Sequence, residues 1–421
     1  MSHEPHPLRA LLLTREYPPE VYGGAGMHVD YLSRELARLV PVEVRTFGEQ
    51  AWRAGGLTVR GFRSAMQGLG EAPAAFHMAL RAVRASTGFA AAPVDADVVH
   101  AHTWYAAFGG LLVRMLYGIP LVVTAHSLEP LRPWKREQLG RGAELSAWLE
   151  RQALEAADAV IAVSQEMRAD LLRLFAVAPE KVTVIGNGVD TGEFRPVAGR
   201  EALRRHGIDP ARPYILFVGR VSRQKGILHL VRAVPRLHPG VQVVLCASAP
   251  DTPDVAAELE AAVAALQARR PGVIWVREMV DRPALIQLYS HAALFCCPSV
   301  YEPFGIINLE AAACEVPVVA SAVGGIPEVV AHGETGLLVP VRLRAGTAFE
   351  PEDPAAFERD LAAALTELLA DPARRRAMGR AGRRRAEARF SWRAVAKQVL
   401  GLYESLVVQR RGPHAAETRN G

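Results

Sequence analysis

The chain has 421 residues, of which half are hydrophobic and 22% are charged, and its formal net charge is +5. This length suits two domains better than one, and the small net charge does not require a nucleic-acid partner. No apolar run approaches the roughly 18 residues of a membrane span, and the first residues lack a signal-peptide pattern. We therefore expect a cytoplasmic protein that binds neither membrane nor nucleic acid.

Short apolar segments read as strands and alternate with helical patterns along the first half of the chain. The expected strands are Arg9–Thr14, Val42–Phe47, Asp97–Ala101, Leu121–Ala125, Ala159–Val163 and Val182–Ile185. Helical patterns cover Met27–Leu39 and Ala147–Ala157 between them. Apolar strands that alternate with helices predict a parallel sheet buried on both faces.

The second half repeats this scheme. Its expected strands are Tyr214–Val218, Val241–Cys246, Val273–Val276, Leu294–Cys297, Val318–Ala320 and Gly336–Val339. Glycine and proline concentrate in Asp190–Arg212, so we place the joint there and predict two doubly wound, Rossmann-like α/β domains. The alternative, one eight-stranded barrel, fits the break in the middle of the chain less well.

Two smaller sets of residues have plain structural interpretations. Nine arginines crowd into residues 374–393, which we interpret as a solvated helix face, with a polyphosphate or RNA patch as the alternative. The four cysteines lie in apolar segments without metal spacing, which predicts buried, reduced thiols: Cys246, Cys296, Cys297 and Cys314.

The first loop, Leu11–Gly26, runs from a strand into a helix and is rich in glycine. Gly23 and Gly24 could cradle a phosphate, although the order Gly-x-Gly-x-x-Gly is missing and no dinucleotide site is predicted. A flexible helix entry is the alternative interpretation.

Histidines end two further strands of the first half. His100 and His102 are two residues apart and could suggest a metal, but we expect them to face opposite sides of the strand, with no third ligand nearby in sequence. We therefore predict no metal site and no cofactor. His126 follows the next strand, and as a residue on its own it is compatible with a satisfied structural histidine.

Two cations follow the first strand of the second half. Arg220 and Lys225 lie just after Gly219, and Lys225 is one of only four lysines in the chain. An arginine that binds two oxygens and a mobile lysine charge suit a diphosphate, and a solvated turn is the alternative.

The most informative segment is Ser299–Glu310. An apolar strand ends at Pro298–Ser299, and a helical pattern begins after Gly305, so the bare N–H groups of a helix start would attract phosphate. Glu302 would lie in the loop and Glu310 on the second helical turn, where each could meet a different part of an extended ligand. The alternative is an acidic surface loop before an ordinary amphipathic helix.

Taken together, these motifs resemble the retaining GT-B glycosyltransferases, the broad group that includes glycogen and sucrose synthases. The resemblance extends from about Arg9 to Val408, and Val21-Tyr-Gly-Gly24 in place of Lys-x-Gly-Gly matches the shorter family-4 enzymes. The segments 126–135 and 277–281 look closest to the actinobacterial glycogen-synthase-like enzymes. The resemblance implies two domains that face each other across a cleft, 1–195 and 210–391. It also implies that a helix, 392–409, crosses back to the first domain, and we expect a disordered tail at 410–421.

The resemblance also implies roles for the candidate residues. His126, Arg220, Lys225 and Glu302 would be catalytic. The donor would be bound by the residues Gly23, Gly24, Gly219, Gly305, Ile306 and Glu310. Acceptor contacts are assigned to Glu16, Arg132 and Lys135.

The implied reaction is retaining α-1,4 transfer of glucose from ADP-glucose, without a metal. The acceptor would be glucose 1-phosphate, giving maltose 1-phosphate, or the end of an α-glucan. Other interpretations stay open: a family-4 enzyme with a UDP- or GDP-sugar, or a non-catalytic GT-B scaffold. Assembly as a homodimer is also left open.

Overall fold

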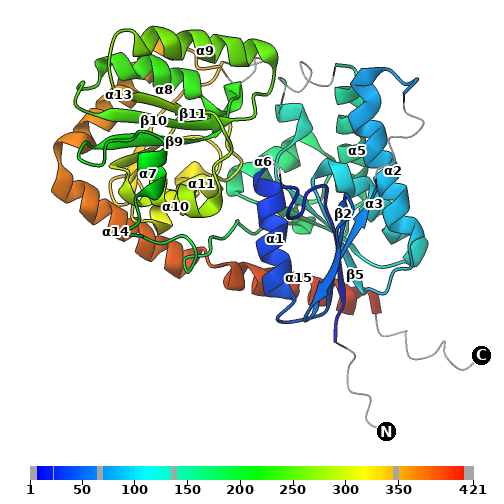
Figure 1. The fold of residues 1–421 in the computed structure, drawn as a ribbon. Helices are drawn as coiled ribbons and strands as arrows, with labels where there is room; N and C mark the ends of the chain where they lie inside the picture. Colours follow the sequence, from blue (N-terminus) through cyan, green and yellow to red (C-terminus); the bar gives the residue numbers. More distant parts are fainter. Residues whose placement is uncertain are drawn as a thin grey trace, which may run out of the picture. The chain divides into compact units, whose positions relative to one another are not determined.

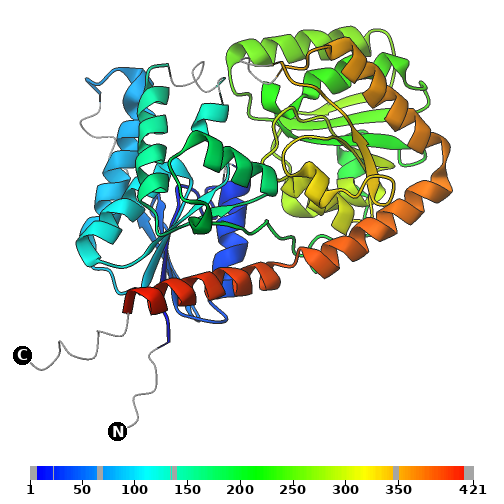
Figure 2. The same cartoon turned by 180° about the vertical axis from the view of Figure 1, so that it is seen from behind.

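The structure is a computed structural model that describes residues 7–21, 23–63, 70–132, 134, 140–344 and 350–411. It divides into two compact units (Figures 1 and 2). Unit 1 comprises residues 1–187 together with 392–421, and unit 2 comprises residues 188–391. The division falls between Asn187 and Gly188, just before the joint expected at Asp190–Arg212.

Unit 1 contains a sheet of eight described strands in the order β3-β4-β2-β1-β5-β6-β7-β8. The strands are β1 (Ala10–Leu13), β2 (Val42–Phe47), β3 (Ala51–Ala54), β4 (Leu57–Phe62), β5 (Val98–His102), β6 (Leu121–Ala125), β7 (Ala159–Ala162) and β8 (Val182–Val184). All pair in parallel except β3, an exposed edge strand that runs antiparallel to β4.

Helices cover both faces of this sheet. They are α1 (Gly24–Leu36), α2 (His77–Ala91), α3 (Thr103–Tyr117), α5 (Gly142–Ala156), α6 (Gln165–Leu174) and α15 (Trp392–Arg411). All four residues of β1 are buried, yet only Ala10 and Leu12 join the core formed with α1 and α15. The last helix of the chain therefore completes the first unit, as the resemblance implied, and Figure 2 shows it in red.

Unit 2 contains a fully parallel sheet of six described strands in the order β11-β10-β9-β12-β13-β14. They are β9 (Tyr214–Arg220), β10 (Gln242–Ser248), β11 (Val273–Val276), β12 (Leu294–Cys297), β13 (Val318–Ser321) and β14 (Gly336–Val339). Its helices are α7 (Glu201–Arg205), α8 (Ile227–Ala233), α9 (Pro253–Gln267), α10 (Arg282–His291), α11 (Ile306–Ala313), α12 (Ile326–Val329), α13 (Pro354–Ala370) and α14 (Pro372–Arg389).

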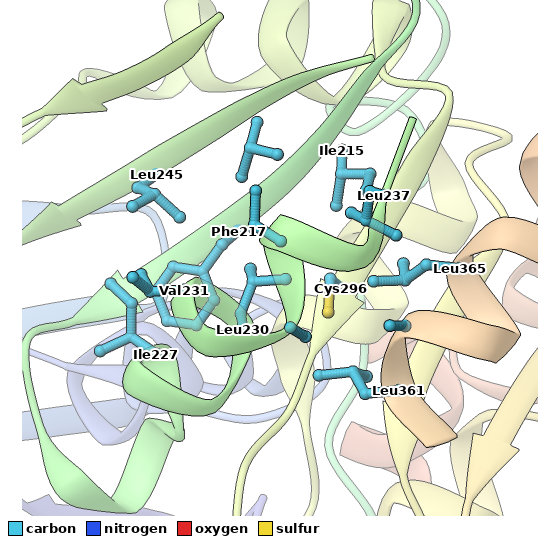
Figure 3. Close-up of a cluster of buried hydrophobic side chains, with 14 of the residues drawn as sticks. Ile215, Phe217, Ile227, Leu230, Val231, Leu237, Leu245, Cys296, Leu361 and Leu365 are labelled. Carbon is cyan, nitrogen blue, oxygen red and sulfur yellow. The ribbon is translucent and has the colours of Figure 1, made fainter. Parts of the chain in front are cut away.

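The core of unit 2 lies between the sheet and the helices α8, α9 and α13. Figure 3 shows Phe217 from β9 beside Val231 from α8, with Leu365 from α13 in the same cluster. These side chains are almost completely buried, and burying such a side chain contributes roughly 1.5–3 kcal/mol.

Arginines of α14 donate hydrogen bonds to backbone carbonyls of other parts of unit 2. Arg383 donates hydrogen bonds to the carbonyls of Thr191, Phe194 and Ala313, and Arg385 donates to those of Glu328 and Val329. These bonds fasten α14 to the rest of unit 2, so these two arginines have a structural use.

The predicted fold class is confirmed: both units are α/β with helices between mainly parallel strands. The four cysteines are free and buried, as expected. Strands β3 and β4, at one edge of the first sheet, were not predicted from the sequence. Among the described helices, none has the length and apolar character needed to cross a bilayer.

Candidate active site

The segment Ser299–Glu310 folds as strand, loop and helix, as the sequence predicted. β12 is fully buried and α11 begins at Ile306, directly after Gly305. Gly305 has φ +97°, and a Cβ there would lie 2.6 Å from Asn308 Nδ2, so the position favours glycine. No side chain caps the start of α11, so its first N–H groups have no capping side chain as acceptor.

Lys225 and Glu302 form an ion pair, with 2.6 Å between Lys225 Nζ and Glu302 Oε2. The Ser299 hydroxyl donates a second hydrogen bond to Glu302 Oε2, at 3.1 Å. Ser222 caps the short 3₁₀ turn that carries Lys225 by accepting from its N–H. Two residues that lie 77 positions apart are thus fixed against each other, with only 16% and 9% of their side chains exposed.

Arg220, the last residue of β9, is held by the carboxylate of Asp251. Asp251 follows β10, whose Ser248 pairs with Arg220 in the sheet. Gly219 lies next to Lys225, since a Cβ at Gly219 would be in ordinary van der Waals contact with Lys225 Cγ, at 3.5 Å. Both cations of the predicted diphosphate site therefore lie at or just after the end of β9, and each is paired with a carboxylate.

Glu310 lies on the second turn of α11 and accepts a hydrogen bond from the Tyr289 hydroxyl at 3.1 Å. Burial raises the pKa of Glu310 to about 7, although the Tyr289 bond and the charge of Arg282 act in the opposite direction. The carboxylate can therefore change its protonation state near neutral pH.

Three residues near this site in unit 2 were not predicted from the sequence. Asp251 and Tyr289 come from other elements and gave no signal beyond their place at a strand end and on a helix. Asn308 is fully buried in α11, and neither polar atom of its side chain has a partner in the described part of the chain.

The loop at Gly324 packs against the backbone of Glu302. A Cβ at Gly324, which has φ +57°, would lie 1.9 Å from the Glu302 carbonyl oxygen. That oxygen accepts the Gly325 N–H at 3.0 Å. The loop at Gly324 and Gly325 therefore holds the backbone of Glu302 in place.

In unit 1, the first loop is fastened by Glu16. Its carboxylate accepts the Gly23 N–H at 2.9 Å, and α1 begins at Gly24 without a side-chain cap. The Gly23 N–H is therefore engaged within the loop, and the helix start at Gly24 offers the N–H groups that a phosphate would need.

His126 belongs to a cluster of four buried or half-buried histidines in unit 1. His126 Nε2 lies 3.1 Å from His102 Nδ1, and the rings of His100 and His102 are 4.1 Å apart. The expectation that His100 and His102 face opposite sides of their strand is therefore wrong, because residues two apart on a strand share a face. His28, from α1, is the fourth member, with its ring 4.6 Å from that of His126.

These histidines are held neutral by burial. Burial lowers the pKa of His28 to about 4, and burial together with neighbouring imidazoles holds the pKa of His100, His102 and His126 well below the usual value. His100 is satisfied by Tyr403 and Thr124, so it has the contacts of a structural histidine.

His28, His102 and His126 are the group that could hold a metal ion, since one ring nitrogen of each lies within 4.8 Å of the others. His28 Nε2 and His102 Nε2 are buried without a hydrogen-bond partner among the described residues. Neutral imidazoles of this kind suit transition metals. Of the pair His100 and His102, only His102 belongs to this group, which His126 and His28 from α1 complete. The prediction of no metal stays a prediction.

Arg132 lies at the end of the loop after β6. Its Nη1 donates to Glu129 Oε1 and to Ser127 Oγ, both at 3.3 Å. Glu129 in turn accepts the Ser146 hydroxyl at 2.8 Å and is almost completely buried. Lys135, the other predicted acceptor cation, lies outside the described residues.

Comparison with known proteins extends this picture. Residues 22–193 match the family model described as Glycosyltransferase Family 4, and residues 200–385 match that described as Glycosyl transferases group 1. The α-maltose-1-phosphate synthase of Mycolicibacterium smegmatis is 48% identical over 409 residues, which cover 95% of this chain and all of that protein. A glycogen synthase of Mycobacterium tuberculosis is 31% identical over 98% of this chain and 97% of that protein.

Among solved structures, the sucrose-phosphate synthase from Thermosynechococcus elongatus superposes with a TM-score of 0.76. It shares 27% sequence identity and covers 95% of this chain and 99% of its own. The two family models together match most of the chain, and relatives well above 30% identity span nearly all of it. The chain belongs to glycosyltransferase family 4 and has the GT-B architecture of two α/β units.

Proposed function

We propose that this chain transfers glucose from ADP-glucose to glucose 1-phosphate, with retention at the anomeric carbon, and so forms maltose 1-phosphate. The observation that carries the proposal is the 48% identity along the full length of an α-maltose-1-phosphate synthase, compared with 31% for a glycogen synthase. Membership of the family implies a nucleotide-sugar substrate, and the choice of ADP-glucose and of the acceptor is the finer part of the proposal.

The donor residues proposed in unit 2 are those gathered around α11. Arg220, Lys225 and the N–H groups after Gly305, including that of Ile306, would bind the diphosphate and stabilise the negative charge that develops as ADP leaves. Glu302 would accept hydrogen bonds from the glucose hydroxyls, and Glu310 from the ribose hydroxyls. The Lys225–Glu302 pair supports this assignment, because it places a cation and a hydroxyl acceptor 2.6 Å apart in a mostly buried setting.

In the proposed reaction, the bond between the glucose anomeric carbon and the β-phosphate oxygen of ADP breaks. The 4-hydroxyl oxygen of glucose 1-phosphate forms the new bond on the same face of the sugar. Its proton passes to the departing phosphate oxygen, so no protein nucleophile is needed. His126 would contact the transferred sugar, and its low pKa makes it a neutral hydrogen-bonding group there.

The experiment is an ADP-release assay with ADP-glucose as donor and either glucose 1-phosphate or glycogen as acceptor. Release that depends on glucose 1-phosphate is the expected result. Release with glycogen alone would replace the proposal with chain elongation. No release with either acceptor, but release with UDP- or GDP-glucose, would overturn the donor assignment.

A further inference from the structure

Three neighbouring strands of unit 1 bring a set of charged side chains to one edge of the sheet. β1, β5 and β6 are adjacent and parallel, so their carboxyl ends meet at the same edge, where doubly wound folds bind ligands. Arg15 follows β1, Tyr105 lies on the first turn of α3 after β5, and Arg132 follows β6.

Tyr105 connects the two arginines. The Arg15 guanidinium lies over the Tyr105 ring, with its carbon 4.3 Å from the ring centre. Burial raises the pKa of the Tyr105 hydroxyl; the charges of Arg15 and Arg132 lower it, and those of Glu129 and Glu16 raise it. Stacking on an aromatic ring fixes the plane of a guanidinium and so orients its N–H groups.

Arg132 is oriented from the protein side by buried acidic groups. Glu129 binds Arg132 Nη1 and is itself fixed by Ser146 and, through its backbone N–H, by Glu150. Burial and the charge of Glu129 raise the pKa of Glu150 well above its usual value, so this carboxyl group takes up a proton more readily than an exposed glutamate does. Glu129 therefore holds Arg132 from the buried side: the Arg132 side chain is 13% exposed and that of Glu129 is 3% exposed.

We propose that Arg15 and Arg132 bind the phosphate group of the acceptor and thereby select a phosphorylated sugar over a neutral glucan end. This inference rests on the function proposed above and adds the residues that decide the acceptor. Glu16 and Glu129 lie nearby, so the local charges nearly cancel and the selection depends on directed hydrogen bonds. A phosphate monoester offers three acceptor oxygens to two planar guanidinium groups, whereas a glucan end offers only hydroxyls.

The test measures KM for glucose 1-phosphate and, separately, KM for ADP-glucose in Arg15→Gln and Arg132→Gln variants. Each variant is expected to raise KM for glucose 1-phosphate by about tenfold or more and to leave KM for ADP-glucose within about twofold. Arg15→Lys and Arg132→Lys keep the charge but lose the planar group that can bind two oxygens at once. Their KM for glucose 1-phosphate should lie between that of the unmodified enzyme and that of the Gln variants. Inorganic phosphate should compete with glucose 1-phosphate in the unmodified enzyme, and more weakly in both Gln variants.

Arg173→Gln is the matched control, because Arg173 is an exposed arginine of unit 1 that pairs with Asp170 on α6. It should leave both KM values unchanged. Unchanged KM for glucose 1-phosphate in all four test variants would overturn the proposal, and so would an equal rise of both KM values. Failure of the unmodified enzyme to use glucose 1-phosphate would instead overturn the proposed function, so the two failures are distinguishable.

Discussion

Lys225 Nζ lies 2.6 Å from Glu302 Oε2, although the two residues come from different loops of unit 2. The pair is mostly buried, and removal of one partner from such a pair leaves the other charge without compensation. Substitution of Lys225 should therefore affect both the proposed chemistry and the local structure, and the two effects need separate measurements.

Lys225→Ala is expected to lower kcat/KM for ADP-glucose by a factor that corresponds to about 2.7–4 kcal/mol, by analogy with the loss of one donor to developing negative charge. Lys397→Ala is the matched control, because Lys397 is exposed on α15. Thermal unfolding of both variants separates activity from stability. A rate close to that of the unmodified enzyme for Lys225→Ala would contradict the diphosphate assignment.

Glu310 should make the stability of the protein depend on pH. Burial raises the pKa of Glu310 to about 7, so the folded state binds this proton more tightly than the unfolded chain does. The contribution to stability is full below the unfolded pKa and is lost as pH rises through about 7. Glu310→Gln should flatten the decline in the free energy of unfolding between about pH 5 and pH 8.

The same group should affect the donor. A carboxylate accepts two ribose hydroxyls better than a neutral acid does, so KM for ADP-glucose should fall as pH rises through about 7. Glu310→Gln should remove that change while Tyr289 keeps a hydrogen-bond partner. Parallel pH profiles for the variant and the unmodified enzyme would count against both the raised pKa and the ribose contact.

Glu150 offers a test of a buried neutral acid. Burial and the charge of Glu129 raise its pKa well above the usual value and so favour the neutral carboxylic acid, which glutamine matches closely in shape. We expect Glu150→Gln to unfold at about the same temperature as the unmodified protein and to lose less stability as pH rises. Glu150→Ala, which leaves the Glu129 N–H without its acceptor, should be clearly less stable. Equal destabilisation by both substitutions would show that the carboxylate is charged.

Tyr403 connects the last helix to the histidine cluster within unit 1. Its hydroxyl lies 2.5 Å from His100 Nδ1, and both side chains are buried. Tyr403→Phe should lower the free energy of unfolding by about 1–3 kcal/mol, because His100 Nδ1 loses its partner. Tyr117→Phe removes a hydroxyl from a partly exposed tyrosine and should cost less than about 0.5 kcal/mol. Equal effects in a denaturant titration would show that the His100 bond contributes no more than a surface one.

The sequence predicted those parts of the fold whose signal is local. The apolar strands and the loop-to-helix turn at Gly305 were found because burial on both faces leaves continuous apolar runs. β3 was missed because all of its residues are exposed, and β4 because its burial alternates and one edge pairs with β3.

Pairings between distant segments could not be predicted in the same way. Lys225 and Glu302 were each assigned, but nothing in the sequence indicates that they bind each other. Asp251 was missed since only the pairing of β9 with β10 brings it to Arg220. The histidine cluster was missed because its members come from α1, β5 and the end of β6.

The central claim is the transfer of glucose to glucose 1-phosphate, and the most direct measurement is the identity of the product. Purified enzyme would be incubated with ADP-glucose and glucose 1-phosphate, and the product examined by NMR. We predict stoichiometric ADP and maltose 1-phosphate with a new α-1,4 linkage. Glucose 1-phosphate recovered unchanged while ADP-glucose is consumed, or a product with a β linkage, would contradict the account.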